Sequence, residues 1–209
     1  MSFGLIIILV VSLGYLSNWL NWRYLNYRFT HFMYYIGAFV HESSHAVLCI
    51  FTGARIQEFS VFSSQPHVLH SKSKLPLIGN FLISSAPLFG GLCFLYIINH
   101  VLLADHFSIA ALTGQWSDIY RGPLDLLAQM RPWEWQMWVM VILFLNIGAM
   151  IGPSIQDIKN VWIVVILAFF IQSPILVQLG LIAVSLILVN IVLQLICISI
   201  LKLYRILRT

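Results

Sequence analysis

The sequence predicts an all-α polytopic membrane protein with about six transmembrane helices and a short membrane-associated β-hairpin after the second. Of its 209 residues, 60% are hydrophobic and only 9% are charged, whereas roughly a quarter of the residues in an average soluble domain are charged. So few charges cannot cover the surface of a soluble domain, and the same composition excludes a disordered chain. The hydrophobic residues also form continuous runs, whereas a transmembrane β-barrel would show alternation.

Six apolar runs divide the chain into the predicted spans of one membrane-embedded domain, residues 1–209. These runs are residues 3–20, 31–53, 75–104, 135–151, 156–172 and 175–203. A helix needs about 20 residues to cross a hydrocarbon core of ~30 Å. The apolar tract 158–203 is therefore too long for one helix, and Gln172-Ser173-Pro174 is its natural break. Gly53 is expected to end the second helix, and Pro87 to bend the third or to allow a close helix contact.

Two connectors between these runs carry structure of their own. Residues 55–62 alternate polar and apolar side chains, as a short half-buried strand does. Residues 63–66 then predict a turn, and Val68-Leu69 begins a return strand, so a β-hairpin is expected here. The connector 105–134 holds four of the seven acidic residues and has a tryptophan cluster at its end, which is typical of a membrane–water interface. The cluster consists of Trp133, Trp135 and Trp138.

Basic residues outnumber acidic residues by 11 to 7, which gives a formal net charge of +4. They lie in the connectors and at the C-terminal end, as orientation by the positive-inside rule requires, so no nucleic acid partner is needed to explain the charge. With six spans, one face of the membrane would hold both termini and seven basic residues: Arg55, Lys72, Lys74, Lys159, Lys202, Arg205 and Arg208. The other face would hold four: Arg23, Arg28, Arg121 and Arg131. The sequence therefore predicts an integral, multi-pass membrane protein with both termini in the cytoplasm.

The segment His41-Glu42-Ser43-Ser44-His45 carries the candidate chemistry. On a helix, His41 and His45 lie one turn apart on one face, where two imidazoles can bind one Zn²⁺ at about 2.0–2.1 Å. Glu42 lies beside them and can act as a general base toward a metal-bound water. The segment falls in the middle of an apolar run, where such residues are expensive unless they are functional. The alternative is a polar trio that joins helices or lines a water pocket.

A catalytic zinc ion needs a third protein ligand and one open position. Asp157 is the candidate, because it follows a Gly152-Pro153 break that can direct a carboxylate back into the helix bundle. The alternative is that Asp157 is an ordinary acid at the start of a helix, favoured by the helix dipole. The two roles are compatible. His67 and His70 are expected at hairpin or surface positions rather than as metal ligands.

Taken together, these motifs resemble those of the site-2 protease family of intramembrane zinc metalloproteases. The resemblance rests on the His41–His45 motif and on the hairpin connector 53–62. It also rests on residues 85–91, similar to the family's Gly-Pro-x-x-Asn element, and on the segment 146–157, similar to the one that supplies the third zinc ligand. Ala86 stands where the family usually has glycine, Gly91 where it often has asparagine, and Ile158 where it usually has glycine.

The resemblance implies a zinc cofactor held by His41, His45 and Asp157. It also implies that the hairpin receives the substrate as an added strand, which an exposed strand edge is suited to do. On that basis Phe59, Ser60 and Val61 are candidate substrate contacts. Asn146 is a candidate for positioning the substrate, and Asn80 is a second candidate for that role.

The function expected from this sequence is that of a zinc-dependent intramembrane endopeptidase, in which Glu42 assists attack by a zinc-bound water. The expected substrate is a single-span membrane protein in the lipid bilayer, with room for a regulatory membrane partner. Two alternatives stay open: a catalytically inactive relative that binds or escorts membrane proteins, and a metal or small-solute transporter. The intact Glu42 speaks against the first alternative. The absence of inverted repeats and of further mid-membrane ligands in the sequence speaks against the second.

Overall fold

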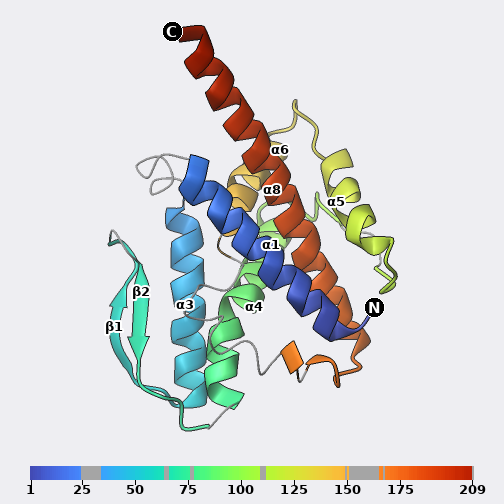
Figure 1. The fold of residues 1–209 in the computed structure, drawn as a ribbon. Helices are drawn as coiled ribbons and strands as arrows, with labels where there is room; N and C mark the ends of the chain where they lie inside the picture. Colours follow the sequence, from blue (N-terminus) through green and yellow to red (C-terminus); the bar gives the residue numbers. More distant parts are fainter. Residues whose placement is uncertain are drawn as a thin grey trace.

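The computed structural model describes residues 1–24, 34–63, 66–75, 78–108, 112–148, 150, 165–166 and 168–208. It is mostly helical, with one two-stranded antiparallel sheet at the side (Figure 1). In chain order the elements are α1 (Phe3–Tyr24), α3 (Tyr35–Thr52), β1 (Ile56–Ser60), β2 (His67–His70), α4 (Ile78–Val101), α5 (Asp118–Ala128), α6 (Trp135–Leu143), the π-helical turn η1 (Phe144–Gly148) and α8 (Pro174–Arg208).

Three described helices are long and apolar enough to cross a membrane: α1, α4 and α8. The 18 residues of α3 would reach about 27 Å at 1.5 Å per residue, but its two histidines and one glutamate reduce its hydropathy. The segment Trp135–Gly148, formed by α6 and η1, is a shorter apolar helix. The membrane character of the chain is therefore supported. The count of six spans stays a prediction, because most of the expected fifth span, 156–172, lies outside the described residues.

The predicted helix boundaries agree with the structure where the sequence carries a backbone signal. Gly53 ends α3 with a φ of 71°, and its N–H bonds back to the carbonyls of Cys49 and Ile50. Glycine adopts this left-handed conformation without the steric cost that a Cβ would bring. The expected break in the last apolar tract is also confirmed, because α8 begins at Pro174, a first-turn position that needs no backbone N–H. Pro87 lies inside α4, which continues through it.

The predicted hairpin is present, with Phe59 opposite Val68, Ser60 opposite His67 and an irregularity between Ile56 and Glu58. It folds back along α3 rather than projecting away from it (Figure 1). The ring of Phe62, just beyond β1, lies 6.2 Å from the ring of Tyr35 at the start of α3. The hairpin therefore flanks α3 from its last turn back to its first.

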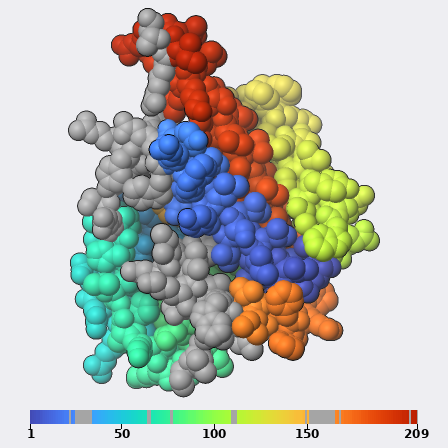
Figure 2. Space-filling view, viewed as in Figure 1, coloured from blue at the N-terminus to red at the C-terminus, as the bar shows by residue number. Residues whose placement is uncertain are grey.

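The core is built around the α1–α8 pair, and α5 and η1 pack onto α8. Helix α6 packs against η1 and adds buried residues to the same core. In Figure 2, α1 crosses the visible face beside α8, with α5 on the far side of α8. Helix α5 is amphipathic: Leu126 is buried, and Gly122 lies against Ser185 of α8, while Tyr120 and Leu124 are exposed. The tryptophan cluster near α6 is exposed as well, as an interfacial location requires.

Candidate metal centre

Helix α3 carries the two histidines and the glutamate of the motif into the protein interior. His41, Glu42 and His45 are 8%, 9% and 8% exposed. Helices α4 and η1 pack against α3. This packing keeps the trio out of contact with lipid. Burying these side chains is unfavourable unless they are paired with each other, with the backbone or with a cation.

Both imidazole rings are fixed by backbone carbonyl groups. His41 Nδ1 lies 2.7 Å from the Met150 carbonyl oxygen, and His45 Nδ1 lies 2.7 Å from the Ile83 carbonyl oxygen. A carbonyl oxygen can only accept a hydrogen bond, so each Nδ1 must carry the proton. Each neutral ring therefore presents a lone pair at Nε2, which is the tautomer that binds a metal ion through Nε2.

The two Nε2 atoms converge on one point. They are 3.2 Å apart, and the ring planes meet at 74°. Two ligands about 2.0–2.1 Å from a tetrahedral zinc ion would be separated by about 3.3–3.4 Å. With both rings neutral, a cation bound between the two nitrogen lone pairs would turn their mutual repulsion into coordination. The two histidines therefore fit a zinc ion. The carbonyl contacts are as important to this fit as the histidines, because they orient both Nε2 atoms toward one point.

The third ligand cannot be located among the described residues. Those residues contain no group of three His, Cys, Asp or Glu side chains arranged to hold a metal ion. Asp157 lies outside the described residues, so its assignment as ligand stays a prediction. Met150, which is among the described residues, lies seven positions before Asp157 in the sequence. Its carbonyl contact with His41 places that point of the chain at the metal centre.

Sequence reasoning missed the contacts that bring η1 to this centre. Gly37 lies four residues before His41, and a Cβ placed there would be 2.8 Å from the Asn146 carbonyl carbon. Helix α3 and η1 therefore touch backbone to backbone, one turn before the metal-binding face. The signal was present in the sequence: Gly37, His41 and His45 share one helix face, and small residues mark close helix contacts in membranes.

The candidate substrate residues occupy two places. On the hairpin, Phe59 is exposed and Ser60 is half-buried, whereas the Val61 side chain is 4% exposed and packs inward. Asn146 lies in η1, buried, and its side-chain amide donates to the Ile142 carbonyl at 2.8 Å. Asn80 accepts a hydrogen bond from the Ser73 backbone N–H at 3.2 Å, so its side chain is used by the connector after the hairpin.

The other histidines of the hairpin have local partners. His67 Nε2 lies 3.3 Å from Glu58 Oε1 on the neighbouring strand, and His70 Nδ1 lies 2.9 Å from the Ser71 carbonyl oxygen. Both residues are on β2, as the sequence predicted.

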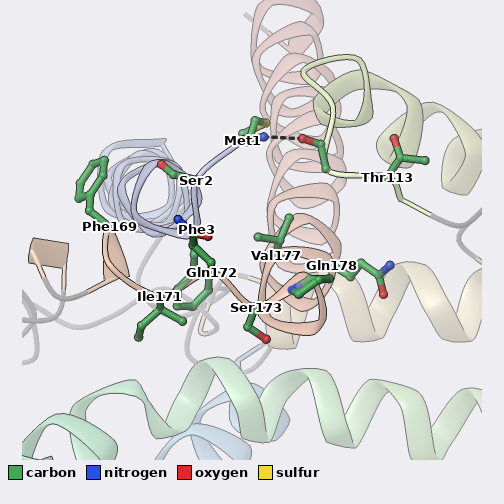
Figure 3. Close-up of a pocket in the computed structure, with 12 residues that line it drawn as sticks. Met1, Ser2, Phe3, Thr113, Phe169, Ile171, Gln172, Ser173, Val177 and Gln178 are labelled. Carbon is green, nitrogen blue, oxygen red and sulfur yellow. Dashed lines mark hydrogen bonds between the residues drawn. The ribbon is translucent and has the colours of Figure 1, made fainter.

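A cavity of about 610 Å³, with none of the trio in its lining, lies beside the first residues of the chain (Figure 3). It is bordered by the first residues of α1, the 113–114 loop and the start of α8, and the Met1 ammonium donates to the Gly114 carbonyl at 2.6 Å. The loop is held by Asp118, whose Oδ2 accepts hydrogen bonds from three backbone N–H groups and the Thr113 hydroxyl. Burial raises the pKa of this carboxyl, but the four donors outweigh it and hold the pKa below its ordinary value.

Comparison with known proteins gives one finding and two negative results. No curated protein and no solved structure matches the chain. The model of the Peptidase M50B-like family matches residues 5–116, more than half of the chain. The matched segment contains the histidine–glutamate trio, the hairpin and α4, and it ends before Asn146 and Asp157. The chain thus belongs to the Peptidase M50B-like family, within the site-2 protease group of membrane peptidases.

Proposed function

We propose that this protein is a zinc-dependent intramembrane endopeptidase that cleaves transmembrane segments of other membrane proteins. The observation that carries the proposal is the pair of histidine Nε2 atoms 3.2 Å apart, each oriented by a carbonyl on its opposite ring nitrogen. His41 and His45 would hold the zinc ion together with Asp157. Membership of a peptidase family supports the same reaction class.

In the reaction, Glu42 is the catalytic residue that moves protons. When bound, zinc supplies Lewis acidity and lowers the pKa of water to near 7. Glu42 takes a proton from the attacking water and later passes it to the leaving amine. The burial of Glu42 strengthens its electrostatic interactions, because little water screens them.

The hairpin is suited to hold the substrate in an extended form. A transmembrane helix hides its amides in internal hydrogen bonds, so it must unwind locally before hydrolysis. Because β1 and β2 flank α3, a strand added to their edge would run along the helix that carries the trio. Phe59, Ser60 and Val61 are the residues proposed to meet the substrate there, largely through their backbone. We propose Asn146, in η1 next to α3, as the residue that positions the substrate from the other side.

The proposal is tested by comparing wild type with Glu42→Gln, using Asp105→Asn as the matched control. Asp105 is exposed, lies outside the trio and pairs with His100, so its amide should leave the reaction intact. Each chain is purified in detergent and assayed for zinc by mass spectrometry. Each is also co-expressed with a panel of single-span membrane reporters, whose fragments are sequenced.

The proposal expects about one zinc per chain in all three proteins and loss of cleavage in Glu42→Gln alone. A wild type that binds zinc and cleaves no reporter, while still retaining membrane proteins in pull-down experiments, would favour an inactive escort protein. A wild type without zinc would refute the metal centre.

A further inference from the structure

Helices α1 and α8 run side by side in the same direction (Figure 1). Four contacts establish this direction, because the residue numbers rise together on both helices. They are Ile6 with Gly180, Ser17 with Asn190, Asn21 with Gln194, and Tyr24 with Lys202. The first contact lies near the start of both helices, and the last lies at the end of α1 and in the last third of α8.

A buried cluster of amides and hydroxyls fixes the register of this pair. The Asn190 amide donates to Ser17 Oγ at 2.8 Å. The Gln194 amide donates to both Ser17 Oγ at 3.0 Å and Asn21 Oδ1 at 2.8 Å. Ser17, Asn190 and Gln194 are fully buried. Sliding or reversing one helix would leave these polar groups without partners in an apolar interior, which is strongly unfavourable.

Tyr34 connects the start of α3 to the same cluster. Its hydroxyl donates to Asn21 Oδ1 at 2.6 Å. Tyr34 immediately precedes α3, so α3 begins at the end of the bundle where α1 finishes. The cluster thus ties three helices together at one level.

Both members of the pair are also long and apolar enough to cross a membrane. We propose that α1 and α8 cross the bilayer in the same direction, so that Met1 and Arg208 lie on opposite faces. The chain from α1 to α8 then crosses the membrane an odd number of times. This differs from the even number that the apolar runs of the sequence suggest, and it does not depend on the proposed protease activity.

The parallel pair also changes how the basic residues are distributed. With the six spans predicted from the sequence, the two termini share one face of the membrane, and seven basic residues lie on that face. In the parallel arrangement, Lys202, Arg205 and Arg208 lie on the face where α1 ends, together with Arg23. Arg55 and Lys74 lie beyond the last turn of α3, on the opposite face.

Protease protection of the full chain tests the proposal. One epitope is placed before Met1 and a different epitope after Thr209, and sealed inverted membrane vesicles are treated with protease. We expect one epitope to be lost and the other to be retained, and both to be lost once detergent opens the vesicles. Loss of both epitopes, or retention of both, in sealed vesicles would overturn the proposal.

Disulfide cross-linking shows whether a failure lies in the helix pair or in its membrane insertion. The background changes to alanine the two described cysteines that are not buried, Cys93 and Cys197. In it, Ile6→Cys with Gly180→Cys should form a disulfide, since a Cβ at Gly180 would lie 3.6 Å from the Ile6 Cβ, within the separation that a disulfide requires. The matched control is Ile6→Cys with Lys202→Cys, which only an antiparallel pair would bring together. Cross-linking of the control pair instead of the first pair would refute the parallel arrangement.

Discussion

Replacing Gly37 by alanine should weaken zinc binding although Gly37 is not a ligand. A Cβ at this position would lie 2.8 Å from the Asn146 carbonyl carbon, whereas two carbon atoms in ordinary contact are about 3.5–4.0 Å apart. Backbone cannot swing aside as a side chain can, so η1 must move away from α3 by roughly 1 Å. Met150 follows η1 closely in the chain, so its carbonyl should move with η1.

The size of the effect follows from the His41–Met150 contact. That contact is 2.7 Å long, and a displacement of about 1 Å would stretch it beyond hydrogen-bond range. Loss of an outer partner of a metal-binding histidine typically lowers metal affinity about 10–100-fold, or roughly 1.4–2.7 kcal/mol. We therefore expect the zinc dissociation constant of Gly37→Ala to rise by that factor, measured by competition with a chromophoric chelator.

Gly180→Ala is the matched control for this measurement. It introduces a similarly close contact, 2.5 Å from the Ile6 side chain, but at the α1–α8 interface away from the trio. It should lower thermal stability and leave the zinc dissociation constant of the folded protein unchanged. The reasoning fails if folded Gly37→Ala binds zinc as tightly as wild type, or if Gly180→Ala weakens binding equally.

Three further outcomes are expected. His41→Ala should reduce bound zinc from about one per chain to near zero in mass spectrometry, whereas His67→Ala on the hairpin should not. Asp118→Asn should lower the free energy of unfolding at pH 7 by about 1–3 kcal/mol, because its carboxylate accepts four hydrogen bonds. Since the folded-state pKa of Asp118 is lowered, this stabilisation is present above the unfolded pKa near 3.9 and disappears as the pH falls through the folded-state pKa. Thermal melts of wild type and Asp118→Asn at several pH values check this. A difference in melting temperature that does not change with pH would mean that the carboxylate does not contribute. Asn190→Leu should cost about 0.6–2 kcal/mol in detergent unfolding, and no loss would mean that the amide cluster does not hold the helix pair together.

Local signals account for what could be predicted from the sequence. The left-handed cap at Gly53, the alternating strand around Phe59 and the helix start at Pro174 each depend on a few neighbouring residues. The histidine–glutamate trio is of the same kind, because helix periodicity alone puts His41 and His45 on one face.

Contacts between distant segments could not be predicted in this way. The carbonyls of Met150 and Ile83, which orient the two histidines, are backbone groups that any residue would supply. The π-helical turn η1 has no composition that distinguishes it from the helix before it. Asn190 and Gln194 stand in a long apolar run, and such a run gives no indication of which helix they bond to or in which direction that helix runs.

The length of α8 determines how the protein can respond to bilayer thickness. Its 35 residues extend about 52 Å, and even a tilt of 40° would leave a projection of about 40 Å across a hydrocarbon core of ~30 Å. If α8 crosses the bilayer as proposed, its final turns would reach into the headgroup region. Lys202 and Arg208 would then be in contact with water, and Leu207, which is 78% exposed, would lie at the interface. Helix α1, with 22 residues, extends only about 33 Å and nearly matches the core. A change in bilayer thickness should therefore produce a hydrophobic mismatch mainly at α1. Helix α8 is longer, so it can accommodate the same change by exposing more or less of its C-terminal end to the headgroup region.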